Sequence, residues 1–179
     1  NPFCLLISVV LSAQSTDVAV NKATASLYSI ASTPAAVLAL GEEALKKYIK
    51  TIGLYHTKAR NVIALCAALV NEHGGQVPET MEELQRLAGV GRKTANVWLN
   101  CVRGEARIAV DTHVFRVSNR LGLTQAANVV QSEQQLMEVI PERYLTRAHH
   151  WLILHGRYIC KARNPMCYHC ELADNCVFE

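Results

Sequence analysis

Residues 87–95 are Leu87-Ala88-Gly89-Val90-Gly91-Arg92-Lys93-Thr94-Ala95, and they are typical of a turn between two helices. Upstream, the capping-box sequence Thr80-Met81-Glu82-Glu83 predicts the start of a helix that ends near Leu87. The two glycines then allow a tight turn and a close approach of the backbone to a ligand. A second helix should begin at Arg92 and run to about Cys101, so the sequence predicts a helical hairpin over about residues 80–101.

The start of the second helix is suited to binding an anion. Its first turn presents unpaired N–H groups and the positive end of the helix dipole, and a phosphate fits both. Taken by themselves, the two glycines would also fit an ordinary helical hairpin without a ligand. The apolar Val90 between Gly89 and Gly91, the capped first helix and the basic Arg92 together favour a helix-hairpin-helix, which binds the DNA backbone without reading base sequence.

Lys93 and Asp111 are the candidate catalytic residues. The helix dipole favours a neutral amine over an ammonium in the first turn, and the neutral amine of Lys93 could attack an electrophilic carbon to form a Schiff base. A surface lysine that touches a phosphate is the simpler alternative. Asp111 follows the apolar run Ile108-Ala109-Val110, where it could cap a helix, accept the lysine proton or stabilise positive charge on a sugar as a base departs. The sequence leaves these alternatives open.

Cysteines gather near the end of the chain, with short unequal loops between them: Cys160, Cys167, Cys170 and Cys176. This pattern predicts four ligands of one metal centre. The total of seven cysteines is odd, so a complete disulfide framework would leave one thiol over. Cys4, Cys66 and Cys101 lie in apolar helical surroundings, and we expect them to be ordinary buried thiols in a reducing cytosol.

The composition indicates a folded protein outside the membrane. Half of the residues are apolar and 18% are charged, which allows a real core, while a net charge of +3 permits a polyanionic partner without demanding one. The longest apolar stretch, Phe3–Ala13, is shorter than the ~20 residues of a membrane span. We expect no secretory signal here, because Asn1-Pro2 offers neither the Met nor the basic segment with which such a signal begins. Because Asn1 stands where Met would begin a gene product, we expect the sequence to start inside a longer chain.

The rest of the sequence predicts helices almost everywhere. Cap residues recur before apolar segments with helical spacing, and only Arg107–Val110 looks extended. The fold class is therefore predicted to be all-α. The composition changes near Gly104, from a segment rich in Ala, Leu and Val to one with most of the late arginines and the cysteines. We expect two domains, residues 1–104 and 105–179.

Motifs along essentially the whole chain resemble the endonuclease III family, the helix-hairpin-helix DNA glycosylases and abasic-site lyases that hold an iron–sulfur cluster. The matching segments are Leu11–Asp17, Gly53–Tyr55, the hairpin, Val110–His113, His149–Trp151, His155–Arg157 and the four late cysteines. The resemblance implies a base-excision repair enzyme for oxidised pyrimidines in double-stranded DNA. It further implies a monomer that acts in the bacterial cytoplasm, at the nucleoid.

The resemblance also assigns roles to single residues. Lys93 would attack C1′ of the damaged nucleotide, expel the base and form a covalent imine, after which elimination cuts the strand. Asp111 would activate the lysine and stabilise the cationic sugar. Gln14 and Leu54 would fill the space that the extruded base leaves in the duplex. Without the family match, a polar helix end and a loop anchor would explain these last two residues.

For the cysteines, the resemblance implies a [4Fe–4S] cluster bound by Cys160, Cys167, Cys170 and Cys176. Tetrahedral zinc is the alternative, although zinc ribbons usually pair two short knuckles and only one is present here. The loop between the first two ligands carries Lys161 and Arg163, which we expect to face DNA phosphates. With every iron bound by a thiolate, the cluster would be structural.

The sequence departs from the family pattern at two places, and three other functions are alternatives. Ala88 stands where the family usually has proline, and the family's leading helix is missing. A monofunctional mismatch adenine glycosylase would lack a lysine at the position of Lys93. A noncatalytic helix-hairpin-helix DNA-binding protein would form no covalent adduct, and an iron–sulfur electron carrier would have no need of the hairpin.

Overall fold

The computed structural model describes residues 1–178. All regular elements in that range are helices, and there is no strand among them. This confirms the predicted all-α fold class. The chain divides into two compact units, Asn1–Arg103 and Gly104–Glu179. Within the described range, every helix is too short or too polar to cross a membrane.

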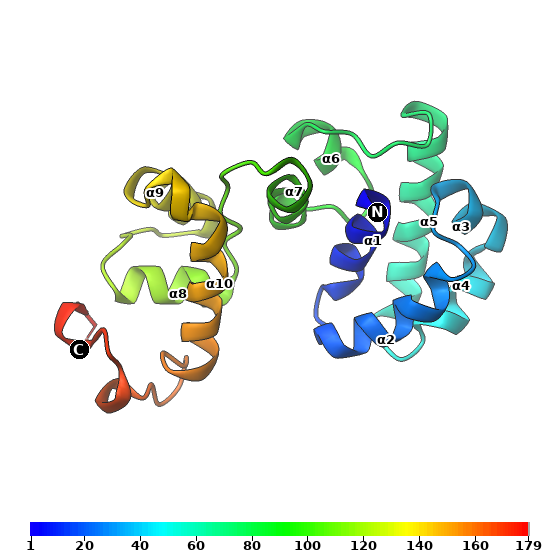
Figure 1. The fold of residues 1–179 in the computed structure, drawn as a ribbon. Coiled ribbons are helices and arrows are strands. Elements are labelled where there is room, and N and C mark those ends of the chain that lie inside the picture. The colour runs from blue at the N-terminus through cyan, green and yellow to red at the C-terminus, as the bar shows by residue number, and fades with distance from the viewer. Residues whose placement is uncertain (179) are drawn as a thin grey trace. The chain divides into compact units, whose positions relative to one another are not determined.

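Seven α-helices and a π-helix form the first unit (Figure 1). Four of them begin at a side-chain cap, from Asn1, Thr16, Thr33 and Thr80. These caps satisfy N–H groups that have no partner within the helix. The elements are α1 (Pro2–Ser12), α2 (Asp17–Tyr28), α3 (Pro34–Leu40), α4 (Glu42–Ile49), α5 (Tyr55–Glu72), α6 (Met81–Arg86), α7 (Arg92–Trp98) and the π-helix η1 (Leu99–Arg103).

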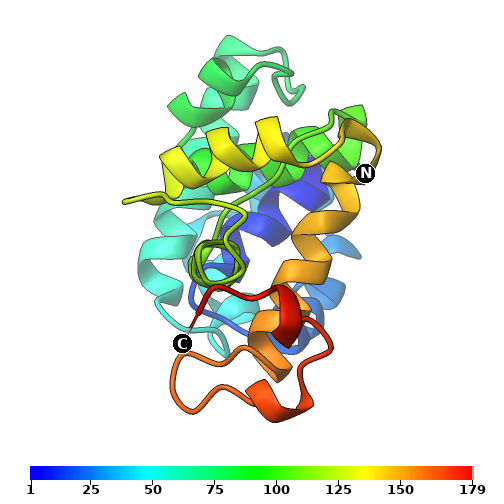
Figure 2. The same cartoon turned by 90° about the vertical axis from the view of Figure 1, so that its left-hand side faces the viewer.

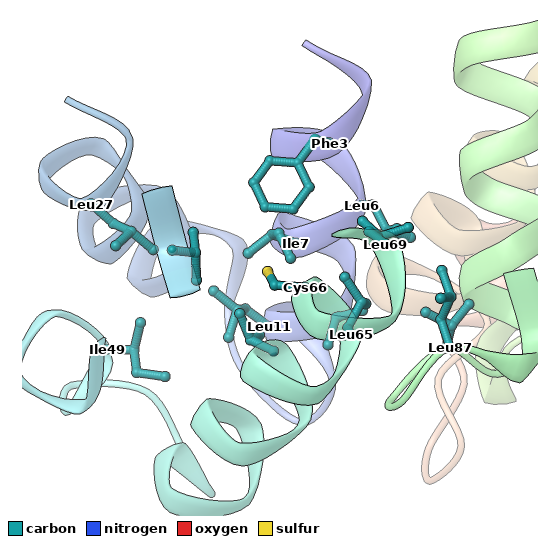
Figure 3. Close-up of a cluster of buried hydrophobic side chains, with 14 of the residues drawn as sticks. Phe3, Leu6, Ile7, Leu11, Leu27, Ile49, Leu65, Cys66, Leu69 and Leu87 are labelled. Carbon is teal, nitrogen blue, oxygen red and sulfur yellow. The ribbon is translucent and has the colours of Figure 1, made fainter. Parts of the chain in front are cut away.

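The core of this unit lies around α1 and α5. Figure 3 shows apolar side chains of α1 meeting those of α5, with contributions from α2, α4 and the end of α6. Leu6, Ile7 and Leu11 from α1 and Leu65 and Leu69 from α5 are all completely buried. Burial of each such side chain contributes roughly 1.5–3 kcal/mol. This core fixes the helices from which the hairpin and the turns at residues 13–16 and 51–54 project.

The described part of the second unit contains three α-helices: α8 (Thr112–Arg120), α9 (Val129–Val139) and α10 (Glu142–Tyr158). Two short 3₁₀ turns follow, η2 (Cys167–His169) and η3 (Ala173–Asn175). Helix α8 packs against both α9 and α10. The close contact with α10 favours a glycine, since a Cβ at Gly156 would lie only 3.0 Å from Cγ2 of Val117. Figure 2 shows the segment after α10, in orange to red, returning beside α8.

The expectation of three buried thiols outside the cluster was wrong for one of them. Cys66 is completely buried, and this burial raises the pKa of its thiol to about 12. Cys4 is half-buried, but Cys101 is exposed. Cys101 lies in η1, where the helix widens from the α to the π form, so its side chain leaves the face that α-helical spacing predicts.

Candidate functional site

The hairpin between α6 and α7 is a compact turn. Leu87 leaves α6 in an extended conformation, and the N–H of Val90 donates to its carbonyl at 3.1 Å. Gly89 has a φ of +79°, which only glycine adopts readily, whereas Gly91 is extended and precedes α7 directly. Val90 is buried and points its side chain into the core, so the backbone of the turn faces outward. The predicted glycine hairpin is therefore present.

Gly89→Ala should destabilise the protein by about 1 to 3 kcal/mol. The positive φ disfavours a side chain, and a Cβ there would lie 3.2 Å from both Asn61 Cβ and Val10 Cγ1. Urea unfolding measures the loss. Gly91→Ser is the matched control, because a Cβ at Gly91 meets nothing within 4 Å and serine is a favourable helix cap. Equal losses in both variants would show that the tight packing at Gly89 is unimportant.

Arg92 and Lys93 occupy the first turn of α7, and both side chains are exposed. The next buried residue is Ala95, whose N–H donates to the carbonyl of Gly91 at 3.0 Å. The core thus holds the helix while its first turn faces solvent. A basic residue and an accessible lysine amine stand side by side at the end of the turn. This arrangement suits a phosphate contact and a nucleophile.

Asp111 caps α8. Its Oδ1 accepts hydrogen bonds from the backbone N–H groups of His113 and Val114, both at 2.9 Å. The preceding segment is buried at Ile108, and Nδ1 of His149 lies 2.7 Å from the carbonyl oxygen of Ala109. The carboxylate is therefore held firmly at the start of α8. The cap proposed from sequence is present, and it leaves a further chemical role for Asp111 as a hypothesis.

Gln14 and Leu54 lie in two turns that the structure brings together. Both residues are exposed and both have a left-handed backbone, with φ of +55° and +58°. Gln14 lies between α1 and α2, and Leu54 comes immediately before α5. The turns touch at Gly53, where a Cβ would lie 3.4 Å from the carbonyl oxygen of Gln14. The exposed side chains of Gln14 and Leu54 therefore project from two turns that are in contact.

The four late cysteines line one small cavity of about 70 Å³ in the second unit. Its other lining residues are mostly apolar, and none is a carboxylate. Across residues 1–178, no three His, Cys, Asp or Glu side chains come close enough together to hold a metal ion. The structure thus brings the predicted ligands around a common space without the distances of a closed metal site. Four thiols and no carboxylate among the lining residues fit a soft metal centre.

Arg120 organises the loop at this cavity. Its guanidinium donates to the carbonyl of Lys161 at 2.8 Å and to that of Ala162 at 3.3 Å, and it lies over the ring of Phe178. Nη1 also lies 3.6 Å from Sγ of Cys160. The loop is therefore anchored from α8, while the side chains of its two basic residues, at 161 and 163, are exposed.

One histidine lies beside the cavity. Nε2 of His155 is 3.7 Å from Sγ of Cys170, and burial lowers the pKa of this histidine. His169, in contrast, is exposed. No sequence motif indicated that Arg120 donates to the loop beside the cavity or that Lys58 donates to Ser15. Only the structure shows these contacts, since they join residues far apart in the chain.

The fold and the hairpin define a class of protein, a helix-hairpin-helix protein of base excision repair. Residues 7–142 match the family model described as "HhH-GPD superfamily base excision DNA repair protein". Endonuclease III of Escherichia coli (strain K12) is 56% identical over 179 residues, which are 100% of this chain and 85% of the relative. Endonuclease III of Rickettsia conorii is 54% identical over 178 residues, 99% of this chain and 85% of the relative.

A solved structure points the same way. It is a trapped endonuclease III–DNA covalent intermediate in an estranged-adenine complex, similar to this chain with a TM-score of 0.92 and 48% identity. The match covers 99% of this chain and 84% of that one. The chain therefore belongs to the endonuclease III family of the HhH-GPD superfamily, which confirms the resemblance seen in its motifs.

Proposed function

We propose that the protein is a bifunctional DNA N-glycosylase and abasic-site lyase that removes oxidised pyrimidines from double-stranded DNA. The observation that carries this proposal is the exposed Lys93 in the first turn of α7, directly after the glycine hairpin. Membership of the endonuclease III family supports it, as does the covalent DNA intermediate of a similar protein. Borohydride trapping on abasic DNA tests it, because reduction turns a lysine imine into a stable adduct.

In the proposed reaction, the Nζ atom of Lys93 attacks C1′ of the damaged nucleotide. The bond between C1′ and the base nitrogen breaks, the base leaves with a proton, and the sugar ring opens to give an imine between Nζ and C1′. Loss of a C2′ proton then breaks the bond from C3′ to its oxygen, which cuts the strand. Water finally hydrolyses the imine and frees the lysine. The position of Lys93 in an exposed first helical turn supports this role.

We assign to Asp111 the uptake of the lysine proton and the stabilisation of positive charge on the sugar. Its fixed position as the cap of α8 supports this assignment, because a carboxylate held by two backbone N–H groups does not reorganise during the reaction. The proposed domains divide these roles. Residues 1–104 carry the hairpin and Lys93, and residues 105–179 carry Asp111 and the cysteines.

DNA is the proposed partner, and its backbone is the main target of the contacts. The residues that we assign to DNA binding are Gly89, Val90, Gly91, Arg92, Lys161, Arg163, Gln14 and Leu54. The first six would contact phosphates through backbone N–H groups or cationic side chains. Gln14 and Leu54 would occupy the space of the extruded nucleotide, which suits two exposed side chains on touching turns. Because the relatives from Escherichia coli and Rickettsia conorii are bacterial, we place this activity at the nucleoid.

The residues present also fit a metal cofactor, and we propose a [4Fe–4S] cluster held by the cysteines at 160, 167, 170 and 176. When bound, the cluster would supply four iron–thiolate bonds that close the end of the chain, with no open position for substrate. Arg120 would keep its anchoring role in the loop and so hold Lys161 and Arg163 on the surface. Zinc is the alternative for the same four thiolates.

Cys170→Ser should remove most of the bound iron and the visible absorbance of the purified protein, because one of four thiolate ligands is lost. Metal analysis and absorption spectroscopy measure both. Cys101→Ser is the matched control, since this exposed thiol belongs to η1 in the first unit and is not one of the residues that line the cavity. A parent protein that contains zinc in place of iron would overturn the cluster assignment. Full iron retention in Cys170→Ser would remove this residue from the ligand set.

A further inference from the structure

Lys58 is a lysine in an unusual place. It lies in the first turn of α5 and is only 5% exposed, although lysine ammonium groups normally reach water. Desolvation lowers the pKa of this lysine. Its Nζ donates a hydrogen bond to Oγ of Ser15 at 2.7 Å. Burial of an apolar side chain here would cost much less free energy than burial of a lysine. This cost indicates that the hydrogen bond to Ser15 has a role of its own.

Ser15 connects this lysine to Gln14. It directly follows Gln14 in the turn after α1, and its N–H donates to the carbonyl of Ser12 at 3.0 Å. A left-handed backbone such as that of Gln14 is unfavourable for a residue other than glycine and persists only where its surroundings hold it. The hydrogen bond from Lys58 anchors the residue next to this strained position.

Lys58 also holds the second turn, through its backbone. Its N–H donates to the carbonyl of Leu54 at 3.0 Å, closing the first turn of α5 on the other left-handed residue. Leu54 itself is 59% exposed, so few side-chain contacts hold it. One residue therefore bonds to Leu54 through its main chain and to the neighbour of Gln14 through its side chain. Gly53 allows the close contact between the two turns.

We propose that Lys58 is a positioning residue that fixes the turns of Gln14 and Leu54 relative to each other, so that both side chains enter the duplex together. The inference rests on the proposed function, because it concerns the step in which a damaged nucleotide leaves the stack. To fill the space of one nucleotide, the side chains of Gln14 and Leu54 must enter the duplex at a fixed distance from each other. A misplacement of about 1 Å lowers rates by as much as a hundredfold in other enzymes.

Lys58→Met keeps the length of the side chain and removes the ammonium, while Ser15→Ala removes only the acceptor. Each should slow single-turnover excision from a duplex with one oxidised pyrimidine by about tenfold to a hundredfold. The double variant should be no slower than Lys58→Met, because both changes break the same bond. Lys47→Met is the matched control, an exposed lysine of α4, and its rate should stay within about twofold of the parent.

Two further readouts separate positioning from a general loss of structure. Affinity for an undamaged duplex, which depends on the hairpin, should be unchanged in Lys58→Met and Ser15→Ala. Borohydride trapping on a single-stranded abasic oligonucleotide should also stay at the parent level, since no stack has to be filled there. Parent-like excision in Ser15→Ala, or an equal fall in all three readouts, would overturn the proposal. If Lys58→Met fails to fold, Ser15→Ala decides alone. A parent protein that forms no adduct would instead overturn the proposed function.

Discussion

Lys93→Gln should reduce the borohydride-trapped adduct with abasic DNA to background and slow base excision by about a thousandfold or more. Glutamine has no nucleophilic amine, so neither the attack on C1′ nor the imine can occur. The substitution lies in the exposed first turn of α7, and the protein should remain folded. Gel analysis of the adduct and single-turnover excision of one oxidised pyrimidine measure the two effects.

Lys93→Arg is the matched control for the charge of the side chain. It keeps a cation for phosphate contact but cannot form an imine, so its affinity for duplex DNA should match the parent while its adduct is absent. If Lys93→Arg restored the adduct, or if Lys93→Gln lost only DNA affinity, the lysine would be a phosphate contact and not the nucleophile.

Asp111→Asn should lower base excision by about a hundredfold to ten-thousandfold, the usual contribution of a positioned proton acceptor. Asparagine removes the negative charge but remains a good helix cap, so the bonds to the N–H groups of His113 and Val114 can persist. DNA binding and the free energy of unfolding should therefore survive. Single-turnover kinetics, a binding titration and urea unfolding separate these quantities.

Asp111→Ala provides the comparison in stability. It removes charge and cap together, and it should cost about 1 kcal/mol of folding free energy beyond the catalytic loss. An Asp111→Asn variant that loses binding and excision in equal measure would argue that Asp111 is only a helix cap. Parent-like excision by Asp111→Asn would lead to the same conclusion.

The hairpin could be predicted from sequence because its determinants are local. The capping box at Thr80 fixes the start of α6, and the side chain of Thr80 indeed accepts from the N–H of Glu83. The left-handed turn at Gly89 favours glycine, and Gly91 leads in an extended conformation directly into α7. Each of these features is set within a few residues, so the pattern specifies the structure.

The buried contact of Lys58 could not be predicted, because it joins residues 43 positions apart. A lysine in the first turn of a helix gives no sign in sequence that it is buried. The same holds for Arg120, whose guanidinium reaches a loop 41 residues away. The left-handed backbone of Gln14 and Leu54 was also invisible, since neither is a glycine. These features depend on tertiary packing that no local pattern encodes.

The site of the four late cysteines could be predicted in part. Their spacing marked the four residues as a group, and the structure places all four around one cavity. The spacing alone could not exclude zinc, because the same thiolates suit both metals. For Cys101 the prediction was wrong. Helical periodicity predicted a buried side chain, but the residue lies in the π-helix η1 and is exposed.

If Lys93 forms the covalent bond to DNA, mapping of the trapped adduct will identify this residue. The parent protein is reduced with borohydride on a duplex that holds one abasic site, digested with protease and analysed by mass spectrometry for the peptide that carries the sugar remnant. We expect the remnant on Lys93. A remnant on another amine, such as Lys58, or the absence of any adduct would contradict it.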